Sequence, residues 1–205
     1  MKSVTCCSLI ALSLAMHPSV AKAQGEIFQG DWYNLDSFTR GCTKLSISGV
    51  GTTWLINGWG ACSPTDCDWG GTIFYPMTDF ASPPLERGFA IWEFGFKTSY
   101  LSVMLVGNQL MADAYNIFHD GSGRDYHDVY TMAKGPSLTI ASSGPSVVVS
   151  WSSSATGFTL QTCTNLSAPV TWTPATNAVT LVNRRFTITD DASIAVRFYR
   201  LQKTN

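Results

Sequence analysis

Short runs of aromatic and β-branched residues recur along almost the whole chain, and Gly, Asn, Pro or Asp separates one run from the next. No window combines a sustained helical period with capping residues, so the pattern predicts an all-β protein. The segments SGVG and VGNQ mark two tight hairpins. Eight sequential antiparallel strands are typical of an up-and-down barrel, which leaves no free sheet edge. In the first part of the chain we expect those strands at 28–34, 43–48, 52–59, 70–76, 88–95, 99–106, 109–118 and 124–132.

A second and smaller β domain is predicted after Ala133–Ser137. Residues 24–134 carry 6 basic and 12 acidic side chains, a net charge of −6, whereas residues 135–205 carry 5 basic and 2 acidic ones, a net charge of +3. The Gly-Pro pair at this point resists both a helix and a central strand, so it suits a hinge. The second part is expected to form a seven-stranded sandwich. Its predicted strands are 137–142, 146–151, 157–163, 170–174, 178–183, 185–189 and 195–202.

Residues 1–23 have the pattern of a secretory signal peptide. Lys2 supplies the positive start, the apolar run Cys6–Met16 is too short to span a bilayer, and Ala21–Ala23 fits the cleavage pattern. We expect cleavage before Gln24 and a secreted, periplasmic or extracellular protein. No later apolar run reaches about 18 residues, so no membrane insertion is expected. Charged residues make up only 13% of the chain, which argues against nucleic acid as a partner.

The segment WGACSPTDCDWG, Trp59–Gly70, concentrates cysteines, aspartates, tryptophans and glycines. A zinc site would need a second Cys or His pair, calcium would need more oxygen ligands, and a redox pair would need Cys-x-x-Cys at a helix start. We therefore expect no metal and no cofactor here. In an exported chain the spacing favours a disulfide between Cys62 and Cys67, worth roughly 2 kcal/mol by loop closure. Cys42 and Cys163 are expected to be free and buried.

The last hairpin of the predicted barrel, NIFHDGSGRDYHDVY, allows its register to be predicted. A turn at Asp120–Gly123 pairs residues whose numbers sum to 243, so Tyr115 would oppose Asp128 and Asp113 would oppose Tyr130. We expect the face richer in small apolar residues to point into the crowded barrel interior. That inner face would carry Leu110, Ala112, Ala114, Asn116, Phe118, Asp125, His127, Val129 and Thr131, and the outer face Met111, Asp113, Tyr115, Ile117, Tyr126, Asp128, Tyr130 and Met132.

Catalytic signals are sparse. The chain has no G-x-S-x-G motif. His119 and His127 each precede an aspartate, but adjacent residues on a strand point to opposite faces, and the predicted register also separates the two histidines. Asp113 and Asp128 could serve as the two carboxylates of a glycosidase, although pairing with tyrosines explains them more simply. We predict no catalytic residues and no enzyme.

Three resemblances rest on motifs of different lengths, the shortest of them three residues. The series W.N.D..T.G, WG.C.PTDCDWG and F.DGSGR..Y, which begins at Trp32, resembles an uncharacterised secreted bacterial β module and implies no chemistry. The GDW that ends at Trp32 is also similar to the first strand of avidins and lipocalins. In the second part, SVVVSW, GFTLQTC and the closing FYRL resemble fibronectin type III-like accessory modules. This likeness implies a structural or adhesive role.

Together these features predict a non-catalytic binding or adhesion protein whose partner is an extracellular glycan or another cell-surface component. The tryptophans would stack on sugar rings, the aspartates would accept hydrogen bonds from hydroxyls, and the disulfide would fix the loop before binding. Alternatively, Trp59 and Trp69 plug the barrel end and the protein is purely structural in the envelope; an enzyme that acts on an extracellular polymer is a third class. The candidate ligand-binding residues are Trp59, Trp69, Asp66, Asp68, Trp32 and Tyr75.

Overall fold

Nearly all of the regular structure is strand, as the sequence pattern predicts. The computed structural model describes residues 25–78, 85–193 and 196–204, so the predicted signal peptide lies outside the described residues. Within the described part, no helix has the length and apolarity that a membrane crossing requires. A short 3-10 helix, η1 (Glu26–Phe28), precedes the first strand. The strands of the first part are β1 (Gly30–Asn34), β2 (Cys42–Val50), β3 (Thr53–Gly60), β4 (Cys67–Thr78), β5 (Glu86–Glu93), β6 (Lys97–Val106), β7 (Gln109–Phe118) and β8 (Tyr126–Lys134).

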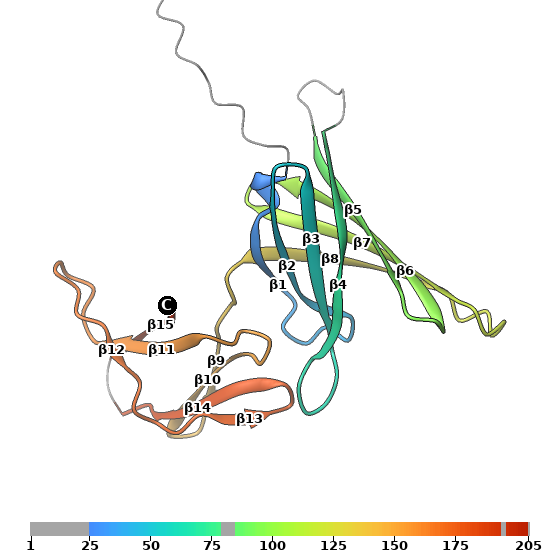
Figure 1. Ribbon diagram of the computed structural model, residues 1–205. Helices are drawn as coiled ribbons and strands as arrows, with labels where there is room; N and C mark the ends of the chain where they lie inside the picture. Colours follow the sequence, from blue (N-terminus) through green and yellow to red (C-terminus); the bar gives the residue numbers. More distant parts are fainter. Residues whose placement is uncertain (1–24, 79–84, 194–195, 205) are drawn as a thin grey trace, which may run out of the picture.

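These eight strands form a closed barrel in which each strand pairs antiparallel with its neighbour in sequence, and β1 pairs with β8 to close it (Figure 1). The predicted up-and-down barrel is confirmed. The β1–β2, β3–β4, β5–β6 and β7–β8 loops consequently lie at one end of the barrel, and the β2–β3 and β6–β7 loops lie at the opposite end with η1.

The η1 end of the barrel is packed with aromatic side chains. Phe28, Trp32 and Trp54 are all less than 2% exposed, and Phe28 contacts the ring of Phe74 edge-on at 5.4 Å. The indole nitrogen of Trp32 donates to the Phe28 carbonyl at 2.7 Å, so this buried polar group is satisfied. Burial of each such side chain contributes about 1.5–3 kcal/mol. The opposite end of the barrel, where the β1–β2, β3–β4, β5–β6 and β7–β8 loops lie, we call the mouth.

The second part folds into the predicted seven-stranded sandwich. A four-stranded sheet runs in the order β13-β14-β10-β9, and a three-stranded sheet runs in the order β12-β11-β15. Val149, Trp151 and Leu160 pack with Ile188 between the two sheets, and the barrel residue Tyr33 is buried in the same cluster. The strands are β9 (Thr139–Ser143), β10 (Ser146–Ser152), β11 (Phe158–Cys163), β12 (Thr173–Pro174), β13 (Thr180–Val182), β14 (Arg185–Asp191) and β15 (Phe198–Lys203).

The predicted register of the β7–β8 hairpin is wrong by one residue. Paired residues sum to 242, so Tyr115 opposes His127 and Asp113 opposes Val129. The connection contains an odd number of residues between the last paired positions, and Asp125 accepts a hydrogen bond from the Phe118 amide across it at 2.8 Å. Because strand side chains alternate, the shift exchanges the two faces of β8 but leaves those of β7 as predicted.

The exchange of faces changes which β8 residues enter the barrel. Tyr130 and Met132 are buried inside, whereas Val129, predicted to face inward, is 55% exposed. On β7, Leu110, Ala112 and Ala114 face the interior as expected. The inward face of β8 is therefore more aromatic and polar than the sequence pattern indicated.

The sandwich meets the barrel at the β13–β14 hairpin. Its two turn residues, Asn183 and Arg184, have φ values of 47° and 62°, as the tight turn between antiparallel strands requires. Arg184 donates to the carbonyl of Thr39 at 3.0 Å, and Arg185 donates to that of Ser37 at 3.4 Å. The β1–β2 loop of the barrel is thereby held to the sandwich.

Candidate functional site

A β-bulge in β4 turns Trp69 into the barrel. Gly58 pairs with Gly70, but Trp59 pairs with Asp68, so Trp69 is the extra residue. Gly70 has a φ of 80°, a conformation that glycine adopts without strain. Bulges of this kind redirect a side chain. The indole of Trp69 consequently lies over Gly58 and Gly60 of β3. It packs edge-on against Trp92, with the two ring centres 5.9 Å apart.

Trp59 lies on the opposite side of the sheet. It pairs with Lys44, whose ammonium stands 4.6 Å from the centre of the indole ring on the outer surface of the barrel. The two tryptophans that flank the cysteine loop therefore do not form one surface. Only Trp69 faces the interior, where it partly fills the mouth.

The two candidate aspartates have structural partners. Asp68 accepts hydrogen bonds from the side-chain amide of Asn57 and from the backbone of Gly70, both at 2.8 Å, and so holds the bulge. The side chain of Asp66 is only 3% exposed and lies 3.6 Å from Arg184 of the second domain. Neither oxygen of Asp66 accepts a hydrogen bond of normal geometry, and burial raises the pKa of this carboxyl despite the nearby arginine.

The remaining two candidates lie elsewhere. Trp32 is 1% exposed within the barrel core, so its ring is inaccessible to a ligand. Tyr75 is 53% exposed on the outer face of β4, where it pairs with Phe89. The six predicted ligand-binding residues thus occupy separate places, and only Trp69 lines the mouth.

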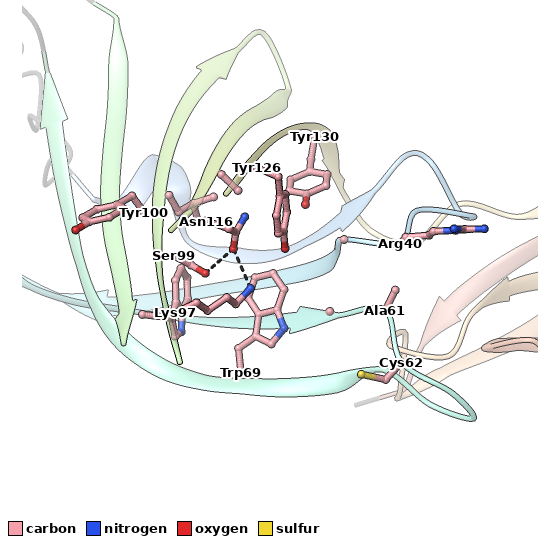
Figure 2. Close-up of a pocket in the computed structure, with 15 residues that line it drawn as sticks. Arg40, Ala61, Cys62, Trp69, Lys97, Ser99, Tyr100, Asn116, Tyr126 and Tyr130 are labelled. Carbon is pink, nitrogen blue, oxygen red and sulfur yellow. Dashed lines mark hydrogen bonds between the residues drawn. The ribbon is translucent and has the colours of Figure 1, made fainter. Parts of the chain in front are cut away.

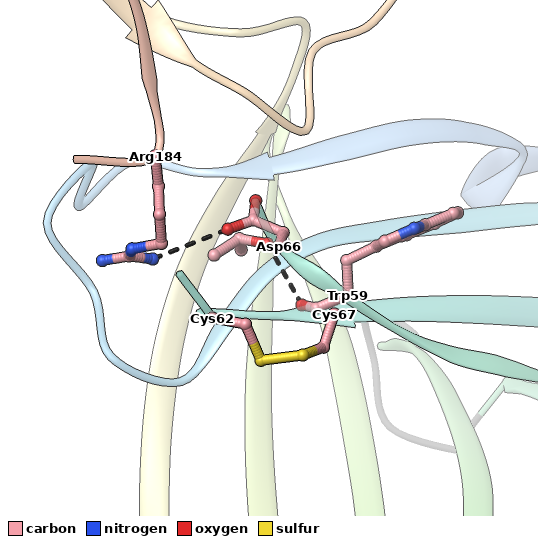
Figure 3. The surroundings of a disulfide bond; sticks show 6 residues. Trp59, Cys62, Asp66, Cys67 and Arg184 are labelled. Carbon is pink, nitrogen blue, oxygen red and sulfur yellow. Dashed lines mark hydrogen bonds and ion pairs between the residues drawn. A yellow bond between two sulfur atoms is a disulfide. The ribbon is translucent and has the colours of Figure 1, made fainter. Parts of the chain in front are cut away.

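The cysteine loop is closed by a disulfide bond, as predicted. Cys62 and Cys67 form a disulfide with their Cα atoms 5.4 Å apart (Figure 3). Cys42 and Cys163 are free and buried, which also agrees with the prediction. Burial raises the pKa of the Cys42 thiol to about 12, so this thiol is not a reactive nucleophile.

The mouth of the barrel contains a cavity of about 160 Å³. Trp92, Leu101 and Ala114 belong both to its lining and to the hydrophobic core, so the cavity ends on packed side chains. The complete lining is Arg40, Gly41, Gly60, Ala61, Cys62, Trp69, Trp92, Lys97, Ser99, Tyr100, Leu101, Ala114, Asn116, Tyr126 and Tyr130.

A polar network lies on one wall of this cavity. The ammonium of Lys97 donates to Oδ1 of Asn116 at 2.9 Å, and the Ser99 hydroxyl donates to the same oxygen at 2.6 Å (Figure 2). A lysine ammonium can only donate, so this contact fixes which side of the Asn116 amide is the oxygen. The Nδ2 group of Asn116 has no hydrogen-bond partner among the described residues, although the residue is only 4% exposed.

Aromatic rings surround the polar wall. The Lys97 ammonium lies between 5.3 and 6.0 Å from the ring centres of Phe94, Phe118 and Tyr126. Burial lowers the pKa of Lys97, and the charge of Asp128 opposes that shift. Asp128 accepts a hydrogen bond from the Tyr130 hydroxyl at 2.9 Å, and burial raises the pKa of that tyrosine.

The sequence analysis missed Lys97, Ser99 and Asn116, although a signal for them was present. In KTSYLSVMLV the inward face reads Lys97, Ser99, Leu101 and Val103, so an apolar stripe becomes polar at one strand end. Asn116 follows Ala112 and Ala114 in the same way on β7. Polar residues that continue an inward apolar stripe toward an open barrel end indicate a lined cavity.

Both histidines lie outside the cavity. On the outer face, His127 stacks on Tyr115 with their ring centres 4.2 Å apart, and its Nε2 lies 3.2 Å from Oδ1 of Asp113. His119 contacts the Thr98 hydroxyl at 2.7 Å. Among the described residues, no three His, Cys, Asp or Glu side chains are grouped so that they could hold a metal ion.

The chain matches no family model, no curated protein and no solved structure. The function proposed below therefore rests on the chemistry of the mouth.

Proposed function

We propose that the barrel is an exported, non-catalytic binding module that holds one sugar ring of an extracellular glycan in its mouth. The observation that carries this proposal is the cavity where Trp69 and Tyr126 stand beside the free amide donor of Asn116. Aromatic faces contact the C–H faces of sugar rings, and amide and hydroxyl groups bond their hydroxyls.

The size of the cavity limits its contents to a single ring. An engineered protein cavity of roughly 150 Å³ holds one benzene molecule, and the mouth offers about 160 Å³ with an opening to solvent. The floor of core residues stops a longer segment from entering. Additional sugar units of a polymer would remain outside the barrel.

The identity of the lining residues favours binding over hydrolysis. A glycosidase needs two carboxyl groups on either side of the scissile bond. Among the described residues that line the cavity there is no Asp, Glu or His. Export remains a proposal that is supported by the pattern of residues 1–23 and by the disulfide, since disulfides persist in oxidising compartments.

A purely structural role is the second candidate. Leu55, Ile73, Tyr75 and Met77 are about half exposed on the outer face of β3 and β4, and apolar groups gathered on a surface favour assembly with another molecule. The fibronectin type III-like resemblance of the second domain, which stays a prediction, would suit either role.

Glycan-array screening followed by calorimetric titration tests the proposal with a matched pair of variants. Tyr126→Ala removes an aromatic ring from the mouth, whereas Tyr115→Ala removes a similarly exposed ring from the outer face of the same hairpin. We expect the first variant to weaken glycan binding about tenfold or more and the second to leave it unchanged. Equal effects of both variants, or no glycan bound by the wild type, would reject the proposal in favour of the structural role.

A further inference from the structure

Lys97 is a half-buried cation without a close counter-ion. Its ammonium touches a neutral amide oxygen and three aromatic faces. Among the described residues, no carboxylate lies within ion-pair distance of it. Asp128 acts on Lys97 only from farther away, and its carboxylate already accepts a hydrogen bond from Tyr130. Buried charges in proteins are normally paired, so this arrangement needs an explanation.

The surroundings of Lys97 stabilise a positive charge but leave its hydrogen-bonding capacity incomplete. Aromatic faces attract a cation but accept no conventional hydrogen bond. Of the three N–H donors on the ammonium, one is used by Asn116. The direction of the Lys97 pKa, lowered by burial, agrees with a cation that has lost water without gaining a close anion.

Two unused donors lie beside each other on this wall. One is the remaining N–H capacity of Lys97, and the other is Nδ2 of Asn116, on the same amide group that Lys97 contacts (Figure 2). A carboxylate presents two acceptor oxygens in one plane and can take one hydrogen bond from each of these neighbours. The Arg40 side chain points away from this wall in Figure 2, so Lys97 is the cation that such a group would meet.

We infer that the cavity selects a sugar ring that carries a carboxylate, a hexuronic acid unit, with Lys97 and Asn116 as the residues that bind the carboxylate. The inference rests on the proposed function and specifies its ligand class. Trp69, which lines the same cavity, contacts the ring, and the carboxylate of the ligand neutralises the charge of Lys97. Because the cavity has a floor, the uronate enters as the end unit of a chain.

Titration calorimetry at low salt with matched monosaccharides tests this selection on the intact protein. Glucuronate is compared with glucose, galacturonate with galactose, and benzoate serves as a ring-sized carboxylate that is not a sugar. We expect the uronates to bind about tenfold or more tightly than the neutral sugars and benzoate, because a charge-assisted hydrogen bond is stronger than a neutral one. The preference should decrease as salt is added.

Lys97→Met removes the charge but keeps an unbranched apolar chain, and should abolish the preference for uronates over neutral sugars. Lys134→Met is the matched control, since Lys134 lies over Trp32, away from the cavity, and its loss should change nothing. Thermal unfolding establishes that both variants fold. Neutral sugars that bind the wild type as tightly as uronates would overturn this inference and leave the proposed function standing. Benzoate that binds as tightly as glucuronate would overturn the assignment to a sugar acid, and binding of neither sugar class would overturn the proposed function itself.

Discussion

The indole of Trp69 occupies the space that any side chain on Gly60 would need: a Cβ at Gly60 would lie 2.5 Å from Nε1 of Trp69. Gly60→Ala should therefore destabilise the barrel by about 1–3 kcal/mol, as overpacking does. In a Trp69→Ala background the same change should cost much less, since the clash is gone. Urea unfolding of the four proteins in this cycle measures the coupling.

Gly71→Ala is the control for that cycle. A Cβ at Gly71 would meet its nearest neighbour, Oδ1 of Asn57, at 3.6 Å, which is ordinary contact. This variant should unfold within about 0.5 kcal/mol of the wild type. Additive effects of Gly60→Ala and Trp69→Ala would contradict the inward position of Trp69.

The disulfide between Cys62 and Cys67 closes a short loop at the mouth. Replacement of both cysteines by Ser should lower the free energy of unfolding by about 2 kcal/mol. Wild-type protein whose disulfide has been reduced should unfold at the same urea concentration as the double variant. If the free energy of unfolding falls by less than about 0.5 kcal/mol, the loop must already have few conformations in the unfolded chain without the disulfide.

Arg184 connects the sandwich to the barrel through the Thr39 carbonyl and the Asp66 carboxylate. Arg184→Ala should speed limited proteolysis at Gly135–Ser137, because the domains then separate more often. Arg200→Ala is the control, since Arg200 contacts Gln161 and Trp172 within the sandwich. Unchanged cleavage in Arg184→Ala would show that the other contacts, such as the burial of Tyr33 and the Arg185–Ser37 hydrogen bond, hold the two parts together without Arg184.

Burial raises the pKa of Asp66, so the folded protein favours the protonated carboxyl. The tighter binding of this proton in the folded state stabilises the fold. That stabilisation is complete below the unfolded pKa of about 3.9 and is lost as the pH rises through the higher folded pKa. The stability of Asp66→Asn relative to the wild type should therefore increase with pH across that window. Urea midpoints from pH 3.5 to 7 measure the difference, and the opposite slope would mean that Arg184 keeps the carboxylate ionised in the fold.

The sequence predicted much of the fold because its signals are local. Alternation and turn residues locate all eight barrel strands, and the short spacing of Cys62 and Cys67 indicates their pairing. The prediction of the β7–β8 register was wrong because the connecting loop is irregular. The length of that loop decides which face each β8 residue takes, and DGSG alone does not give this length. The sequence did not predict the bulge at Trp69 for a similar reason, because the bulge depends on how β4 pairs with β3.

The candidate site was harder to predict than the fold because it depends on contacts between distant parts of the chain. Trp69 lines the cavity at the mouth, but its supposed partner Trp59 lies outside the barrel. Asp66 was expected at a ligand surface and instead faces Arg184 from the other domain. No local pattern carries the information that β6 and β7 bring Lys97 and Asn116 together at the mouth.

Binding of a sugar ring in the mouth of the barrel can be followed through the indole N–H signals of the tryptophans in a ¹H–¹⁵N NMR titration with glucuronate. The indole nitrogens of Trp32 and Trp54 bond backbone carbonyls in the packed end, whereas Trp69 lines the cavity. If the mouth binds the sugar ring, the Trp69 signal shifts in a saturable manner while the Trp32 and Trp54 signals stay in place. A titration in which Trp69 stays in place, or in which only the outward-facing Trp59 shifts, would contradict binding in the mouth.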